Sequence, residues 1–505
     1  MTKSEESLFE KLLHLLGQKL NKYRMPIIAA LLSGFAAHGF SFANKLVQQD
    51  DLNAFFGKGA SVTSGRWMLE ALSTIMPDYS MPWIYGIMSL LLLTAAVCVV
   101  IKLLDIKSPV MQCLFAAIFA AFPTVTGIFT MPFTAAPYSL AILMAALGTY
   151  YLHENALLRN IAGVVLVALS AGIYQAYISF AASLLIAAMI KSLTIDGTDA
   201  KTVFKAGVRY LLLLAAALVA YGAVTLIVNL FCGAELASYA YADSSILLRI
   251  KSAYTSFAGY FIKGYFSFIN STASLVFHIV TAICALYALC MALRGKGTAE
   301  KLLTALLMLL LPLSINSLYL ASSPDVLGAT GFVSFTVLYA ITAMLLDGAA
   351  AKLPGMTGRG ARGLALLSFC VITAGNIYFA NEVYLKLYMQ TGEMTSFYTS
   401  VMTQIMAYDE YDGSQRIAFL GTPEKFAYQL EGPDTSNFKG LVSEDVYGIY
   451  SREDFVKLYL GYDVEFAPQE ICEGLSEWEE IKAMPVYPAS GSICRAADTI
   501  VVKFQ

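Results

Sequence analysis

Two adjacent carboxylates, Asp50 and Asp51, lie just after the first apolar stretch of the chain. Neighbouring negative charges repel each other, which raises the pKa of one carboxyl toward neutral pH, where it can accept a proton. Acidic residues at the end of an apolar segment are more often solvated caps, so the pair alone does not establish chemistry. The sequence therefore makes Asp50 and Asp51 candidate general bases, with a structural role as the alternative.

Three basic residues stand among Tyr and Phe in a second segment, residues 232–271. They are Arg249, Lys251 and Lys263. Cations at the level of lipid headgroups can bind an anionic phosphate through charge-assisted hydrogen bonds. Aromatic and basic residues also anchor a segment at the membrane interface without binding any ligand. The sequence leaves both interpretations of this segment open.

Four polar side chains are expected near the ends of apolar segments on the same side of the membrane. They are Tyr138, Tyr174, Gln175 and Asn316. A polar group at membrane depth is costly unless it lines a protein-filled or hydrated cavity. Each residue alone is more often structural, but their shared depth makes them candidates for substrate binding.

Apolar runs long enough to cross a membrane make up most of the chain. Of the 505 residues, 58% are hydrophobic and 14% are charged, whereas an ordinary globular chain has about 25% charged residues. A hydrocarbon core of roughly 30 Å needs about 20 helical residues. We therefore predict an α-helical polytopic membrane protein with about 11 spans. The predicted spans are residues 25–43, 81–104, 109–129, 133–151, 158–173, 176–191, 210–231, 272–293, 302–321, 329–347 and 363–381.

The distribution of Lys and Arg predicts the orientation. With eleven spans and a cytoplasmic N-terminus, basic residues gather in the inner loops, as the positive-inside rule requires. The fifth and sixth spans meet at Tyr174 without a polar loop, so one long broken helix is the alternative. That alternative would place the basic loop at Arg294 and Lys296 outside, and we therefore prefer eleven spans.

This topology divides the chain into three parts. Residues 1–24 are predicted to form an amphipathic helix on the inner leaflet, because leucines recur there at helical spacing. Residues 25–381 form the transmembrane domain, with long outer loops at 44–80 and 232–271. Residues 382–505 are predicted to form a small α/β domain outside the membrane.

The C-terminal part mixes helical and strand-like sequence. Helical sequence is expected at residues 397–408, and strand-like runs are expected at 416–420, 445–450 and 499–504. Cys472 and Cys494 fall in this domain, where an oxidising environment would permit a disulfide. The sequence leaves open whether they are bonded.

Several function classes lack their motifs. The chain has no phosphate-binding GxxxxGK[ST] loop, no dinucleotide fingerprint and no His/Cys cluster for a metal. No nucleic-acid partner is expected. A transporter or flippase for a lipid-linked glycan is the main alternative to an enzyme, but no internal repeat supports it. An assembly protein that binds envelope polymers would explain the outer domain and not the acidic first loop.

The order of parts resembles the GtrII-like glucosyltransferases, bacterial enzymes that add glucosyl groups to surface glycans. The resemblance rests on the Asp-Asp pair, Gly65-Arg66-Trp67, Tyr138 in a Pro-flanked span, Gly172-Ile173-Tyr174-Gln175 and the C-terminal Ile500–Phe504. It implies the GT-C fold and an acidic catalytic residue in the first outer loop. It also implies a polyprenyl-phosphate sugar donor, such as undecaprenyl phosphate glucose, and an acceptor such as O-antigen or another cell-envelope polysaccharide.

Carried onto this sequence, the resemblance makes Asp50 or Asp51 the general base of an inverting transfer, with Asp51 preferred. Arg66, together with Arg249, Lys251 or Lys263, would offset charge on the departing phosphate. Lys503 matches a position to which the resemblance gives importance and no chemical role. No metal or other cofactor is expected. The implied location is the bacterial inner membrane, with a donor-synthesising synthase and a flippase as further partners.

Overall fold

The structure is a computed structural model that describes residues 21–48, 51, 62–76, 79–235, 245–262, 271–321, 329–349, 355–423 and 452–505. The predicted inner-leaflet helix at 1–24 lies almost wholly outside the described residues. So does the predicted strand at 445–450. The first half of the chain contains α2 (Arg24–Ala43), α4 (Trp67–Ser73), α5 (Pro82–Leu103), α6 (Pro109–Ala120), α7 (Pro123–Phe129), α8 (Pro132–His153), α9 (Leu157–Ile173), α10 (Tyr177–Thr194) and α11 (Ala200–Cys232). The second half contains α12 (Ile246–Ile262), α13 (Ser271–Leu293), α14 (Thr298–Ile315), α15 (Thr336–Gly348) and α16 (Gly355–Met406).

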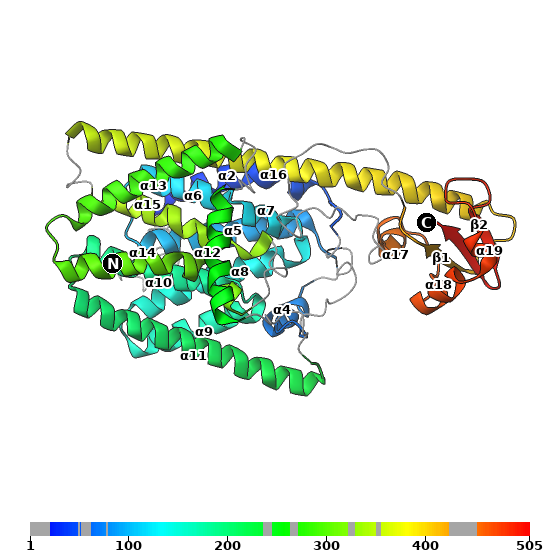
Figure 1. Cartoon of the computed structure of the whole chain (residues 1–505), viewed down its shortest axis with the longest axis horizontal. Helices are drawn as coiled ribbons and strands as arrows, with labels where there is room; N and C mark the ends of the chain where they lie inside the picture. Colours follow the sequence, from blue (N-terminus) through cyan, green and yellow to red (C-terminus); the bar gives the residue numbers. More distant parts are fainter. Residues whose placement is uncertain are drawn as a thin grey trace, which may run out of the picture.

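Most of these helices are apolar and gather into one bundle (Figure 1). Among the described residues, eight helices are long and apolar enough to cross a membrane, and the pair α6 and α7, bent by 43°, makes up to nine. Helix α9 and residues Val333–Gly348 are apolar but shorter. The chain is a polytopic helical membrane protein, and the number of eleven spans stays a prediction.

The chain reverses direction between α9 and α10, so they are two helices and not one broken helix. Tyr138, near the start of α8, packs against Tyr174 and Tyr177 at the start of α10. At the other end of these two helices, His153 lies near Lys191. Helices α8 and α10 therefore run in the same direction, and α9 runs opposite to both.

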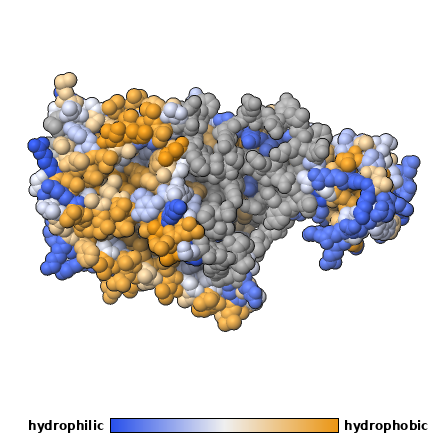
Figure 2. Space-filling view, viewed as in Figure 1, coloured by the Kyte–Doolittle hydropathy of each residue, from blue (hydrophilic) through white to orange (hydrophobic). Residues whose placement is uncertain are grey.

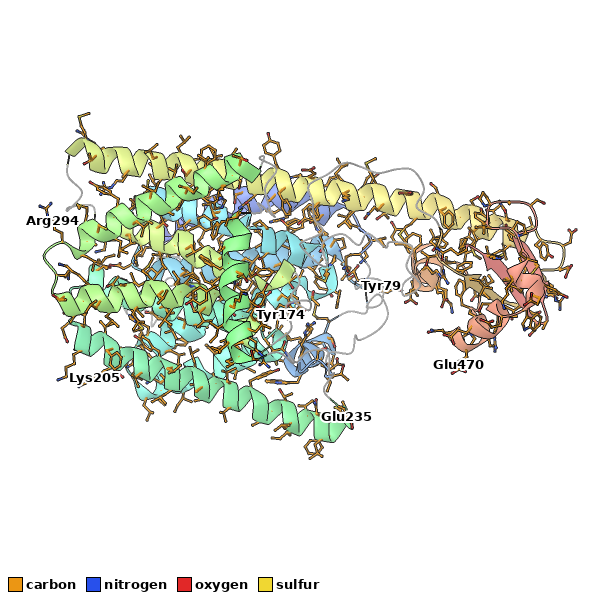
Figure 3. The ribbon with its side chains drawn as sticks, viewed as in Figure 1. Tyr79, Tyr174, Lys205, Glu235, Arg294 and Glu470 are labelled. Atoms are coloured by element: carbon orange, nitrogen blue, oxygen red, sulfur yellow. The ribbon has the colours of Figure 1, made fainter. Side chains whose placement is uncertain are left out.

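The two ends of the helical bundle are formed by different connecting segments of the chain. Figure 3 shows Lys205 and Arg294 at one end, and Tyr79 and Glu235 at the other end, on the side of the C-terminal domain. Figure 2 shows an apolar surface on the bundle next to polar residues at that first end, and many polar residues on the C-terminal domain. This arrangement is typical of a protein that crosses a bilayer with basic loops on one side.

Helix α16 joins the bundle to the C-terminal domain without a break (Figure 1). The sequence predicted a span at 363–381 and helical sequence at 397–408, and both belong to this one helix of 52 residues. No proline interrupts residues 355–406, and Phe397, Tyr398 and Met402 are buried in the core of the C-terminal domain. Both predicted segments are therefore helical, and the structure joins them into one helix.

The C-terminal domain has a three-stranded sheet beside the end of α16. The sheet consists of β1 (Arg416–Leu420), β2 (Ile493–Ala496) and β3 (Thr499–Lys503) in the order β1-β3-β2. Strand β3 pairs parallel with β1 and antiparallel with β2. The predicted strands at 416–420 and 499–504 are confirmed, whereas β2 was not predicted. Both Cys472 and Cys494 are free thiols.

Candidate active site

The Asp51 carboxylate is buried and has three polar partners. Its side chain forms an ion pair with Lys45 and a hydrogen bond with Ser80, whose hydroxyl also bonds Lys45. The backbone N–H of Phe133 donates to Asp51 Oδ1 over 3.3 Å. Only 1% of the residue is exposed. Asp51 is therefore a buried acidic group held by partners from three separate parts of the chain.

Each partner is supplied by the end of an apolar helix. Lys45 follows α2, Ser80 precedes α5, and Phe133 is the second residue of α8. The N-terminus of a helix carries free N–H groups and a partial positive charge, which favour an anion. The packing of these three helices thus creates an electropositive position, and the carboxylate of Asp51 occupies it.

Burial and the polar partners of Asp51 shift the pKa of its carboxyl in opposite directions. Burial, the largest effect, raises the pKa of the carboxyl above its usual value. The charge of Lys45 and the hydrogen bonds from Lys45, Ser80 and Phe133 lower it. Because burial dominates, Asp51 is a stronger proton acceptor than an exposed aspartate.

A second group of side chains surrounds Arg66, the residue before α4. Arg66 Nη1 donates to the hydroxyl of Tyr138 over 3.2 Å, and its guanidinium lies 4.9 Å from the centre of the Tyr174 ring. The rings of Tyr138 and Tyr174 are stacked at 4.7 Å. Three predicted site residues from distant parts of the sequence therefore form one cluster.

Gln175 holds the loop that carries Arg66 in place through hydrogen bonds. Its Nε2 donates to the carbonyl oxygen of Ser64 over 2.7 Å and to the hydroxyl of Tyr221 over 2.9 Å. Gly65 has φ +71°, and a Cβ there would lie 2.6 Å from the Tyr221 oxygen. Glycine at position 65 thus permits both the left-handed backbone and the close approach of Tyr221.

The two groups lie near each other on α8. Phe133, which contacts Asp51, and Tyr138, which contacts Arg66, are five residues apart in this helix. At 1.5 Å per residue this corresponds to about 7.5 Å along the helix axis. Both groups therefore contact the first two turns of α8.

Two buried polar atoms beside Arg66 have no hydrogen-bond partner among the described residues. They are the hydroxyl of Tyr177 and Nε1 of Trp67. The ring of Tyr177 contacts the rings of both Tyr138 and Tyr174. An unpaired buried donor is costly and calls for an explanation. Both atoms can bind hydroxyl groups of a sugar.

Other predicted residues lie elsewhere. Arg249, on α12, donates to the carbonyl oxygen of Leu320 over 3.0 Å, and Asn316 donates to that of Ala253 over 2.9 Å. These bonds attach α12 to the end of α14, and α12 runs across the other helices (Figure 1). Lys251 on the same helix is exposed.

Lys503 is bound within the C-terminal domain. Its ammonium donates to the carbonyl oxygens of Lys482 and Met484 over 2.7 and 3.0 Å. The structure therefore does not bring Lys503 to the cluster at Arg66. Asp50 and Lys263 lie outside the described residues, and among the described residues no group of three or more His, Cys, Asp or Glu side chains could hold a metal ion.

The sequence analysis missed several residues that complete the site. Lys45 lies six positions before Asp51 on the same loop, and this spacing was the available signal. Ser80, Tyr177 and Tyr221 gave no signal, because they reach the site from segments far apart in the sequence.

The comparison with family models decides the family. The model described as "Glucosyl transferase GtrII" matches residues 39–346, more than half of the chain. The chain belongs to the GtrII glucosyltransferase family. The matched region contains Asp51, Arg66 and the tyrosine cluster. Family membership implies glucosyltransferase activity for this membrane protein. No curated protein and no solved structure matches the chain.

Proposed function

We propose that this GtrII protein transfers glucose, or another hexose, from a polyprenyl-phosphate donor to a cell-envelope glycan such as O-antigen. The observation that carries the proposal is the buried Asp51 carboxylate, held at the start of α8, the helix whose Tyr138 contacts Arg66. The reaction belongs to the outer face of the bacterial inner membrane, with the N-terminus in the cytoplasm and a GT-C architecture.

Asp51 is the general base in this proposal. The acceptor hydroxyl attacks the anomeric carbon and gives its proton to Asp51, while the bond from that carbon to the phosphate oxygen breaks. The electron pair leaves with polyprenyl phosphate. A single displacement inverts the anomeric configuration. Polyprenyl phosphate is itself a good leaving group, so the reaction is proposed to need no metal.

The residues around Arg66 bind the sugar phosphate. The guanidinium of Arg66 stabilises negative charge that develops on the departing phosphate. The hydroxyl of Tyr177 and Nε1 of Trp67, which have no hydrogen-bond partner within the described part of the chain, are proposed to bind hexose hydroxyls. A synthase that makes the donor and a flippase that delivers it to the outer leaflet are the expected partners.

Turnover by purified protein tests the assignment of Asp51. With radiolabelled polyprenyl-phosphate glucose and envelope glycan, we expect the wild-type protein to release free polyprenyl phosphate. We expect Asp51→Asn to reduce kcat by about 10²-fold or more, because loss of a general base typically costs 10² to 10⁴. A transporter would move the donor without releasing polyprenyl phosphate.

Asp347→Asn is the matched control for this experiment. Asp347 accepts hydrogen bonds from the backbone N–H groups of Lys107 and Ser108, in a loop connection away from the tyrosine cluster. The substitution removes the same charge and should leave turnover within about twofold, since surface changes away from such sites have small effects. Equal turnover in wild type and Asp51→Asn would refute the general-base assignment.

A further inference from the structure

In the ion pair between Lys45 and Asp51, the two side chains differ in solvent exposure. The Asp51 side chain is 2% exposed, whereas the Lys45 side chain is 22% exposed. Lys45 is therefore the more accessible member of the pair. In this arrangement Asp51 is engaged by Lys45 and is not free to accept a proton from an acceptor hydroxyl.

The partners of Asp51 are those that an anionic ligand also prefers. Lys45 supplies an ammonium, and the start of α8 supplies the N–H of Phe133 and the positive end of a helix of 22 residues. The phosphate of the donor is a diester with one negative charge on two non-bridging oxygens, as in a carboxylate, and helix N-termini readily bind phosphate. A phosphate placed beside Lys45 would thus compete with Asp51 for the same ammonium.

Ser80 keeps the ammonium of Lys45 near this position. Its hydroxyl is a hydrogen-bond partner of Lys45, and its carbonyl oxygen accepts a second bond from Lys45 over 3.2 Å. Lys45 can therefore change its anionic partner by a small movement while Ser80 continues to hold it. No large rearrangement of the helices is needed.

We propose that Lys45 is a donor-binding residue that exchanges Asp51 for the phosphate of the donor. The inference rests on the proposed function. In the free enzyme Lys45 neutralises Asp51. When the donor binds, the ammonium pairs with its phosphate, and Asp51 becomes free to take the proton of the acceptor hydroxyl. The electron pair of the broken bond then leaves on a phosphate oxygen that Lys45 already contacts.

The exchange also orders the reaction. Because Asp51 becomes an available base only after the phosphate has taken Lys45, the donor binds productively before the acceptor. After transfer, polyprenyl phosphate departs, the proton passes from Asp51 to water, and Lys45 returns to the carboxylate.

Equilibrium binding of sugar-free polyprenyl phosphate to the full-length protein tests the exchange without turnover. We expect Asp51→Asn to bind this probe about tenfold more tightly than wild type, because Lys45 no longer has to leave a carboxylate. The double variant Lys45→Met/Asp51→Asn should lose that gain. It leaves neither residue charged and unpaired, and its thermal unfolding transition reports whether it is folded.

A double-mutant cycle separates exchange from simple repulsion between Asp51 and the probe. If Asp51 only repels the probe, Asp51→Asn should increase the affinity for the probe equally in the wild-type and the Lys45→Met backgrounds. Exchange predicts that Asp51→Asn increases the affinity only when Lys45 is present. Equal gains, or no gain in Asp51→Asn, would overturn the exchange while leaving the proposed function standing if turnover still requires Asp51. A wild-type protein that binds no polyprenyl phosphate would overturn both.

Discussion

At the scale of single residues, the chemistry depends on how Asp51 is solvated. An exposed aspartate is a weak base, and a fully buried, unpaired one would be protonated and unable to act as a base at neutral pH. Asp51 lies between these extremes, because burial raises its pKa while Lys45, Ser80 and the Phe133 N–H lower it. The ion pair therefore sets the pH at which this residue can accept a proton.

The pH dependence of kcat/KM for the donor should show this balance. Since kcat/KM reports groups of the free enzyme, its acidic limb should lie above 3.8, the usual pKa of Asp. Activity should rise with pH as Asp51 loses its proton. Lys45→Gln removes a charge that lowers the pKa of Asp51, so the acidic limb should move to higher pH. An unchanged limb would mean that another group titrates.

At the scale of elements, the contact between α4 and α9 positions Arg66. A Cβ at Gly172, in the last turn of α9, would lie 2.6 Å from a ring carbon of Trp67. Trp67 is the first residue of α4 and follows Arg66 directly. The absence of a side chain at position 172 therefore allows α4 to approach, and this approach places the guanidinium over Tyr174.

Gly172→Ala should displace α4 and reduce kcat/KM by about tenfold or more, because small errors in positioning are costly. The cost in the free energy of unfolding should be about 1–3 kcal/mol. Steady-state kinetics and thermal unfolding measure the two effects.

Gly222→Ala on α11 is the matched control for this change, since nothing lies within 4 Å of a Cβ there. It should keep wild-type activity. If both substitutions leave kcat/KM unchanged, the contact of α4 with α9 does not position Arg66.

At the scale of the whole molecule, α16 fixes the C-terminal domain to the same side as the candidate site. Val47, four residues before Asp51, donates its N–H to the hydroxyl of Thr391 on α16 over 3.1 Å. Val47 also belongs to the core cluster that contains Phe397 and Phe504. The loop of Asp51 is thus packed against the base of the C-terminal domain, and both must lie on one side of the membrane.

Protease access tests the predicted orientation. Trypsin added to right-side-out vesicles should cut the C-terminal domain, where Lys482 and Arg495 are exposed, and should spare the loop at Arg294. Inverted vesicles should show the opposite pattern, because Arg294 lies at the other end of the bundle (Figure 3). Detergent should expose all three sites. The reverse result in intact vesicles would invert the topology.

The sequence by itself determined the class of the protein and much of the site. Apolar run length identified a polytopic helical membrane protein, because a bilayer imposes a minimum helix length. The acidic loop and the residues at 138 and 174–175 were found from polarity at the ends of apolar runs, and Arg66 from the family resemblance. The strands at 416–420 and 499–504 were predicted from strand-like sequence, and the structure has them at Arg416–Leu420 and Thr499–Lys503.

Only the tertiary structure decided which of these residues meet. Asp51 joins Lys45, Ser80 and Phe133, and Arg66 joins Tyr138 and Tyr174, whereas Arg249 and Lys503 bind elsewhere. Local patterns fix the depth of a side chain in the membrane, but not its neighbours. Those depend on how helices distant in sequence pack, and this packing also merged two predicted helices into α16.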